Sequence, residues 1–114
     1  MKPKKLIRSK IIKYLKDGEF ETIEDLGELN GLYALKVMEE LSEIQQSNHS
    51  DIMEFIDLMQ VVFQFAVENG FSKEQISNAL IDKSLEKGNF GRLALNNLNP
   101  ENPSNALYFK TKDK

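Results

Sequence analysis

The spacing of apolar residues along the chain predicts a series of amphipathic helices joined by short polar connections. In residues 4–16, apolar side chains recur three or four positions apart, which is the spacing of one helix face. These side chains are Leu6, Ile7, Ile11, Tyr14 and Leu15. Gly18 follows where a glycine commonly ends a helix. Residues 19–30 alternate only weakly between apolar and polar positions, and we expect a connector there, ended by Asn30 and Gly31.

Residues 33–69 predict an antiparallel helical hairpin, around which the rest of the chain is organised. The polar stretch at residues 47–50 is typical of a turn between its two arms. The first arm is expected to bury Ala34, Val37, Met38, Leu41 and Ile44. The second arm carries a broad apolar stripe made of Ile52, Phe55, Ile56, Met59, Phe63 and Ala66.

The second arm is also apolar on the opposite side, where Leu58, Val61 and Phe65 lie. A helix that is apolar nearly all round is normally enclosed by other elements. A chain of 114 residues has few helices with which to enclose it. We therefore expect an all-α helical bundle that is built on the antiparallel hairpin and completed by homo-oligomerisation, as a dimer or a tetramer.

A further helix is predicted to begin after Ser72, because Ser72 and Gln75 have the spacing of a capping box. Phe71 and Ile76 flank them as a hydrophobic staple, and Gly88 is expected to end this helix. Residues 93–98 are expected to form a short helix. We predict one domain over residues 1–98 and a tail over 99–114. The apolar side chains expected to dock that tail on a neighbour are Leu107, Tyr108 and Phe109.

The hairpin carries one pair of acids on each arm, Glu40 with Glu43 and Glu54 with Asp57, and each pair is spaced as neighbours on one helix face. Bending the chain within residues 47–50 brings Glu43 level with Glu54, and Glu40 level with Asp57. Four carboxylates this close repel one another unless a cation neutralises them. Oxygen ligands alone favour a hard divalent cation.

Simpler interpretations of these residues are a capping and a solvated role. Glu54 would belong to a capping box that begins at Asp51, and Glu39, Glu40 and Glu43 would form a solvated helix face. His49 is the only histidine and lies in the predicted turn. Its isolation argues against a di-iron bundle, which needs paired Glu-x-x-His motifs.

Charge and composition narrow the class of protein further. Seven of the 15 basic residues fall within the first 16 positions, although the net charge is −3. They form either a solvated face or a surface on which Arg8 or Lys10 contacts a substrate phosphate. Nucleic-acid binding is not expected, because the rest of the chain is acidic. The chain contains no cysteine for a disulfide or a thiolate metal site.

No apolar run approaches the roughly 18 residues that would cross a membrane. The N-terminal residues also lack the long apolar region of a signal peptide. We therefore expect a soluble, cytoplasmic protein without a membrane partner.

Four ordered stretches resemble the motifs of one enzyme family. Residues 5–11 (KLIRSKI) are similar to an opening K-L-V-R-D-K-I, and residues 36–43 (KVMEELSE) to K-L-x-E-E-x-x-E. Residues 54–57 (EFID) match E-x-x-D, and residues 83–90 (KSLEKGNF) are similar to a closing K-x-x-x-R-G-G-F. The chain thus resembles the all-α nucleoside triphosphate pyrophosphohydrolases of the MazG and phosphoribosyl-ATP pyrophosphohydrolase type.

The chain departs from these motifs at three positions. Ser9 stands where the opening motif usually has Asp, and Lys87 and Asn89 replace the Arg and the second Gly of the closing motif. Ten residues separate Glu43 from Glu54, a short spacer that is similar to the compact phosphoribosyl-ATP-like members. The acid quartet is intact, whereas the altered basic motif leaves the substrate open.

The resemblance implies cleavage of a nucleoside triphosphate between its α and β phosphates, giving a monophosphate and pyrophosphate. It implies Mg²⁺, with Mn²⁺ as a substitute, held by Glu40, Glu43, Glu54 and Asp57. The metal would neutralise the phosphates and polarise the attacked phosphorus.

The resemblance also implies roles for the basic residues and for a general base. The residues implied to bind the phosphates are Arg8, Lys36, Lys83 and Lys87. Of these, Lys83 would also stabilise the leaving pyrophosphate. Glu39 or Glu43 would take the proton of the attacking water, and the pattern does not choose between them.

Two other classes stay open. One is a catalytically weak nucleotide-binding or regulatory protein on the same scaffold, because the basic turn is altered. The other is a plain helical interaction module whose basic N-terminal helix meets an acidic partner.

Overall fold

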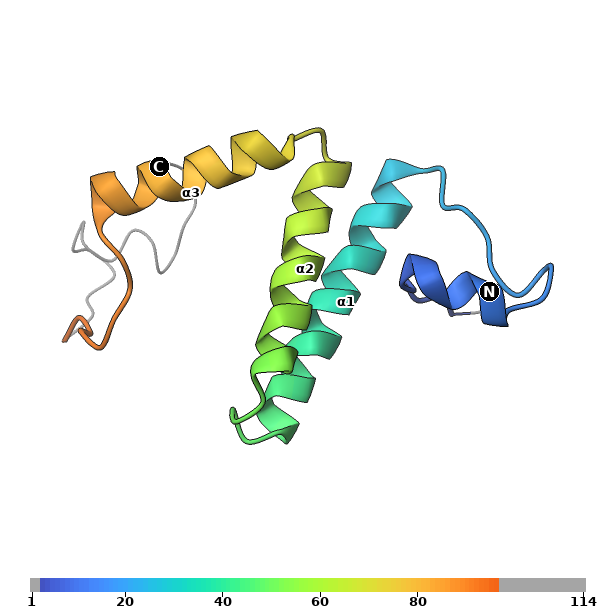
Figure 1. The fold of residues 1–114 in the computed structure, drawn as a ribbon, viewed down its shortest axis with the longest axis horizontal. Coiled ribbons are helices and arrows are strands. Elements are labelled where there is room, and N and C mark those ends of the chain that lie inside the picture. Colours follow the sequence, from blue (N-terminus) through green and yellow to red (C-terminus); the bar gives the residue numbers. More distant parts are fainter. Residues whose placement is uncertain (1–2, 97–114) are drawn as a thin grey trace. The chain divides into compact units, whose positions relative to one another are not determined.

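The computed structural model describes residues 3–96, and the regular structure within that range is helical (Figure 1). It contains a 3₁₀ helix η1 (Ser9–Tyr14) and three α-helices, α1 (Leu26–Gln46), α2 (Ile52–Glu68) and α3 (Lys73–Lys87). Residues 3–96 include no strand, so the predicted all-α class is confirmed. None of the helices within that range combines the length and hydrophobicity needed to cross a membrane.

The predicted hairpin is confirmed, with α1 and α2 packed side by side in opposite directions (Figure 1). Asn48 and His49 make the reversal, and both have a φ of 61°, in the left-handed region. The His49 N–H donates to the Ile44 carbonyl at 3.1 Å, which ties the turn to the end of α1. Asp51 then caps α2 by accepting a hydrogen bond from the Met53 N–H. The reversal therefore uses residues that tolerate a positive φ, followed by an N-cap.

Helix α1 begins earlier than expected, so the prediction of a connector over residues 19–30 was wrong for its second half. The side chain of Asp25 accepts a hydrogen bond from the Glu28 N–H at 2.8 Å and caps the helix. Gly27 and Gly31 lie inside the first turns and interrupt the apolar pattern there. Cap chemistry and packing against α2 outweigh the low helix propensity of the two glycines.

The predicted helix over residues 4–16 was also wrong, because only Ser9–Tyr14 are helical and their helix is of the 3₁₀ type. Residues 3–8 have no regular structure, and their cations pair with acids of the hairpin. Lys4 pairs with Glu28 at 2.8 Å, and Lys5 pairs with Glu39 at 3.1 Å. These contacts with the hairpin compete with the intrinsic tendency of this segment to form an isolated helix.

Burial along α1 differs from the prediction. Ile44 is buried with 4% of its surface exposed, and Val37 is half-buried. Met38, Leu41 and Ala34, which were expected to be buried, are exposed. Glu40 is buried instead, so the face of α1 that meets α2 includes an acid.

Helix α2 also packs differently from the prediction. Leu58, Val61 and Phe65, from the face expected to await a second chain, are all half-buried. The ring of Phe65 stacks on Tyr33 of α1, with centroids 5.1 Å apart and planes 11° apart. From the expected core stripe, Ile56, Phe63 and Ala66 are half-buried. Met59 is exposed. Three further exposed apolar side chains form what we call the outer face of α2: Ile52, Phe55 and Val62.

The predicted start of α3 is confirmed by a reciprocal capping box. The Ser72 N–H donates to Gln75 Oε1 at 2.7 Å, and the Gln75 N–H donates to Ser72 Oγ at 3.0 Å. The helix ends at Lys87, and Gly88 follows with a φ of 78°. That conformation favours glycine, as the sequence pattern indicated.

The chain divides into two units, Met1–Ile81 and Asp82–Lys114, and the first contains the whole hairpin. The short helix expected over residues 93–98 is absent over 93–96. Residues 97–98 and the predicted tail at 99–114, with Leu107, Tyr108 and Phe109, lie outside the described residues. The division into a domain over 1–98 and a tail stays a prediction.

Candidate metal centre

Glu40 is the most enclosed charged residue in the described part of the chain, with 6% of its surface exposed. It lies one helical turn before Ile44, the buried hydrophobic residue of α1. Burying a carboxylate is costly unless it is paired and hydrogen-bonded. The enclosure of Glu40 in the hairpin therefore requires a compensating partner.

Carboxylates from both helices meet at Glu40. Glu40, Glu54 and Asp57 each offer one oxygen, and these oxygens all lie within 4.8 Å of one another. Glu39, Glu40 and Glu43 form a second such group on α1 alone. Glu40 belongs to both groups, so the five acids make one continuous cluster, which we call the acid cluster.

Two oxygens of the acid cluster are buried without a hydrogen-bond partner. They are Oε1 of Glu40 and Oε1 of Glu54, one on each helix. Glu40 Oε2 faces the Lys36 ammonium at 3.4 Å, so Glu40 is only half satisfied. Buried carboxylate oxygens without partners indicate a missing proton, water or cation.

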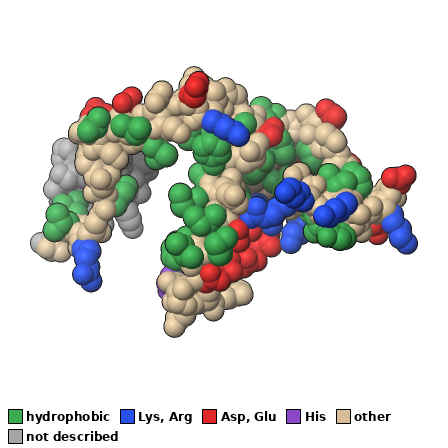
Figure 2. Space-filling view, viewed as in Figure 1, with side chains coloured by type: hydrophobic (Ala, Val, Ile, Leu, Met, Phe, Trp, Pro, Cys, Tyr) green, Lys and Arg blue, Asp and Glu red, His purple; other side chains and the backbone are tan. Residues whose placement is uncertain are grey.

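The acids of the acid cluster outnumber the cations that pair with them. Three cations pair with its acids: Lys5 with Glu39, Lys36 with Glu39 and Glu40, and Arg8 with Asp57. Five carboxylates against three cations leave a formal charge of minus two when all groups are ionised. Figure 2 shows basic side chains beside the acidic patch on the hairpin.

The pKa of Glu54 is raised, and its causes identify its neighbours. Desolvation by burial is the largest cause, followed by the charges of Glu43, Asp51 and Asp57. Glu43 and Asp57 therefore lie near the Glu54 carboxylate.

Glu39 has the opposite environment at the rim of the acid cluster. Its two oxygens accept hydrogen bonds from the ammonium groups of Lys36 at 3.2 Å and Lys5 at 3.1 Å. These two bonds, that of Lys5 being the larger cause, lower the pKa of Glu39. Glu39 is thus held as a carboxylate whose affinity for a proton is reduced.

The simpler interpretation predicted that Glu54 belongs to the capping box of its own helix, and this prediction was wrong. Asp51 makes the cap through the Met53 N–H at 3.0 Å. Among the hydrogen bonds of residues 3–96, none joins the Glu54 carboxylate to the Asp51 N–H. The Glu54 side chain faces the other acids instead.

Two of the predicted phosphate-binding residues lie at the acid cluster. Lys36 is half-buried against Glu39 and Glu40. Arg8 donates one hydrogen bond to Asp57 at 2.7 Å and another to Gln60 at 2.9 Å. Lys83 and Lys87 belong to the second unit, on the exposed surface of α3, and their roles stay predictions.

The interpretation of the sequence missed Lys5 and Gln60. Lys5 lies three residues before Arg8 in the N-terminal segment, and it reaches Glu39 because this segment is not helical. Gln60 continues the three-residue spacing of Glu54 and Asp57 along α2. That spacing was the available signal for Gln60, whereas Lys5 could not be assigned without knowing the path of the segment.

No family model, no curated protein and no solved structure matches the chain. The acid cluster and the motif resemblance involve the same residues of α1, α2 and the N-terminal segment.

Proposed function

We propose that the chain is a Mg²⁺-dependent nucleoside triphosphate pyrophosphohydrolase of the all-α MazG and phosphoribosyl-ATP type. It would cleave between the α and β phosphates to give a nucleoside monophosphate and pyrophosphate. One observation carries the proposal. The buried Glu40, with an unpartnered oxygen, converges with Glu54 and Asp57 from the other helix.

The donor set fits a hard divalent cation. All the ligands are carboxylate oxygens, which Mg²⁺ prefers and for which Mn²⁺ can substitute. Oxygens bound to one Mg²⁺ lie about 3–4 Å apart, close to the 4.8 Å limit within which Glu40, Glu54 and Asp57 gather. Glu43 would join them, because it already lies beside Glu54. The bound cation would neutralise phosphate charge and polarise the attacked phosphorus.

Arg8 and Lys36 would bind the polyphosphate next to these acids. The guanidinium of Arg8 holds the Asp57 carboxylate and the Gln60 amide oxygen at once. A phosphate matches the same fork of donors. When a cation binds Asp57, Arg8 would therefore leave Asp57 and bind a substrate phosphate instead. The proposed roles of Lys83 and Lys87 at the leaving pyrophosphate depend on the motif resemblance.

The contacts of the two candidate bases favour Glu43 over Glu39. Attack of water on the α phosphorus breaks the bond to the bridging oxygen, and a carboxylate receives the proton that water loses. Glu39 is already engaged by two lysines, which lower its pKa. Within residues 3–96, Glu43 forms no ion pair with a basic side chain. We therefore assign the proton to Glu43.

The proposal includes a homo-oligomer, either a dimer or a tetramer. The outer face of α2 exposes apolar side chains, with 71% of Ile52 and 50% of Val62 accessible. Such a contiguous patch is typical of an interaction surface. A second copy of α2 would cover it and complete a helical bundle.

The alternative is a catalytically weak nucleotide-binding protein on the same scaffold. Its support is the Arg8–Asp57 ion pair at 2.7 Å, which occupies a proposed metal ligand. The changes at Lys87 and Asn89 in the closing motif point the same way. In that case a nucleotide would bind with Mg²⁺ and stay intact.

The reaction products test the proposal directly. We expect the purified chain, given a panel of nucleoside triphosphates with Mg²⁺, to release pyrophosphate and a nucleoside monophosphate. Glu54→Ala should lower turnover by about a hundredfold or more, because it removes a metal ligand. The control is Glu24→Ala, since Glu24 is an exposed acid outside the cluster. Orthophosphate and a diphosphate as primary products would refute the assignment, and binding without any product would favour the alternative.

A further inference from the structure

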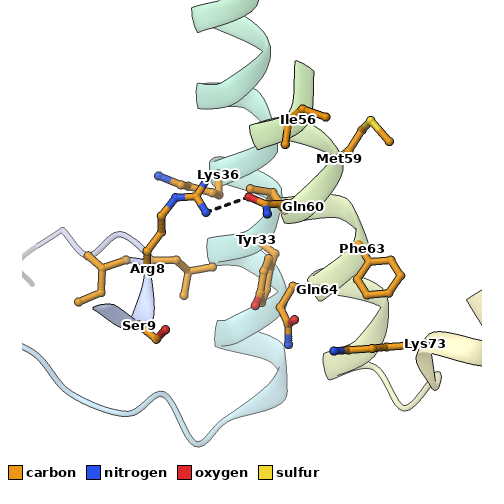
Figure 3. A pocket seen from close by; sticks show the side chains of 13 residues that line it. Arg8, Ser9, Tyr33, Lys36, Ile56, Met59, Gln60, Phe63, Gln64 and Lys73 are labelled. Atoms are coloured by element: carbon orange, nitrogen blue, oxygen red, sulfur yellow. Dashed lines mark hydrogen bonds between the residues drawn. The ribbon is translucent and has the colours of Figure 1, made fainter. Parts of the chain in front are cut away.

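An open groove lies between the N-terminal segment and the hairpin (Figure 3). Its walls are residues 6–9, one side of α1 at Tyr33 and Lys36, one face of α2, and Lys73. Its volume is about 840 Å³, within the range of roughly 300–1,000 Å³ typical of small-molecule sites. All of these residues belong to the first unit of the chain.

The lining of the groove combines cations with apolar surface. Its charged side chains are Arg8, Lys36 and Lys73, and no acid lines it, although the chain has a net charge of −3. The apolar side chains of the lining are Leu6, Ile7, Ile56, Met59, Val61 and Phe63. This combination favours an anionic ligand with an apolar body.

Two side-chain amides on α2 can form hydrogen bonds with the polar edge of a ligand in the groove. Gln60 and Gln64 are four residues apart and therefore lie on one face of the helix. Figure 3 shows both side chains beside Tyr33, on the side where Arg8 and Lys36 lie. Each amide can both donate and accept in one plane, as the edge of a nucleobase does. Tyr33 is fixed by its stack on Phe65 and is a rigid part of the wall.

The groove is continuous with the acid cluster through shared residues. Arg8 lines the groove and bonds to Asp57, and Lys36 lines the groove and pairs with Glu40. A ligand whose phosphates meet these two cations would therefore extend its remaining part along α2 toward Gln64 and Lys73.

We propose that this groove holds the nucleoside part of a nucleoside phosphate, with Gln64 reading the edge of the base. The inference builds on the proposed function, because it takes the phosphates to lie at Arg8 and Lys36. Gln60 positions Arg8 by accepting its hydrogen bond at 2.9 Å. Gln64 donates one N–H to Glu68 Oε2 at 3.2 Å, which leaves its amide oxygen and its second N–H for the base. These two groups make the site selective among bases.

Metal-free binding tests the groove separately from catalysis. The probes are the four common nucleoside monophosphates and ribose 5-phosphate, added to the full chain in the presence of EDTA. Methionine methyl NMR reports the site, because Met59 lines the groove whereas Met38 and Met53 do not. We expect the Met59 signal to shift with at least one nucleotide, at about tenfold lower concentration than with ribose 5-phosphate. The signals of Met38 and Met53 should stay in place.

A matched pair of glutamine variants isolates the base contact. Gln64→Leu should weaken binding of the preferred monophosphate by about three- to tenfold, the size expected for one lost hydrogen bond. Binding of ribose 5-phosphate should not change. Gln45→Leu is the control, because Gln45 is exposed on α1 and does not line the groove.

Three outcomes would overturn the inference. Equal binding of all nucleotides and ribose 5-phosphate would show that no base is read, and unchanged binding in Gln64→Leu would exclude this amide. A Met59 signal that depends on protein concentration and not on nucleotide would assign the groove to a second copy of the chain. Release of pyrophosphate without base selectivity would support the proposed function and refute the base-reading groove. Selective metal-free binding without turnover would support the groove and refute the proposed function.

Discussion

Two faces of the hairpin reverse the usual relation between burial and polarity: a charged residue is enclosed on the inner face, and apolar residues are exposed on the outer face of α2. The inner face, where α1 meets α2, encloses the Glu40 carboxylate, whereas the outer face exposes Ile52, Phe55 and Val62. In an isolated domain, burial normally favours the hydrophobic residues and exposure the charged ones. Glu40 has one partner, the Lys36 ammonium at 3.4 Å, and we propose a further partner for each face, different in kind. A cation compensates for enclosed carboxylates, whereas an apolar surface of another chain removes exposed hydrophobic area from water.

The comparison also separates two sources of stability. The inner face would gain free energy of folding from metal binding, which depends on metal concentration. The outer face would gain it from association, which depends on protein concentration. Substitutions on the inner face should thus change how stability depends on metal concentration. Substitutions on the outer face should change how stability depends on protein concentration.

The largest effect on assembly is expected from a charge on the outer face. Phe55→Glu should weaken self-association by about 3 kcal/mol, because it removes a large apolar contact and places a carboxylate in the interface. Light scattering at micromolar concentration should then show a monomer where the unaltered chain is an oligomer. Gln45→Glu, which adds the same charge at an exposed position of α1, is the control. A folded monomer for the unaltered chain would contradict the assigned role of the outer face.

A smaller effect, of opposite sign for metal and substrate, is expected at Arg8. Arg8→Ala frees Asp57 and should tighten Mg²⁺ binding about two- to fivefold, the size expected for a partly exposed ion pair. It should lower nucleotide turnover by about tenfold or more, because a phosphate loses its guanidinium partner. Calorimetry and a pyrophosphate assay measure the two quantities. Lys16→Ala is the control, since Lys16 is exposed and within residues 3–96 its side chain forms no ion pair. Equal losses of metal and substrate binding would contradict the exchange of partners at Arg8.

The smallest effect concerns pH in the metal-free protein. The folded state raises the pKa of Glu54, chiefly by desolvation and then through Glu43, so it binds a proton more tightly than the unfolded state does. The contribution of Glu54 to stability is therefore present at low pH and is lost as the pH rises through the raised value. Chemical denaturation with EDTA should show this loss, and Glu54→Gln should remove it. An unchanged pH profile in Glu54→Gln would show that another group titrates.

Elements with local signals could be predicted from the sequence. The turn near Asn48 and the capping box of Ser72 and Gln75 are encoded by neighbouring residues, and both form as expected. The candidate acids were found in the same way, because a spacing of three places Glu54 and Asp57 on one helix face. Such features need no knowledge of the tertiary structure.

Features that depend on distant contacts could not be predicted. Residues 4–16 have a helical pattern, but Lys5 and Arg8 pair with acids more than 30 positions away, and the segment follows the hairpin instead. The packed side of α2 was also ambiguous. Both of its faces are apolar, so hydrophobicity alone did not identify Phe65 as the partner of Tyr33.

The most direct test of the central claim is the melting temperature with and without Mg²⁺ for the unaltered chain and for Glu40→Gln. In EDTA, Glu40→Gln should melt higher, because a neutral amide relieves the repulsion at the enclosed carboxylate. At about a hundredfold excess of Mg²⁺ over its Kd, the unaltered chain should gain about 2–3 kcal/mol and melt higher than the variant. Glu24→Gln should respond to Mg²⁺ as the unaltered chain does. An equal rise for Glu40→Gln and the unaltered chain, or no rise for either, would contradict a metal centre at Glu40.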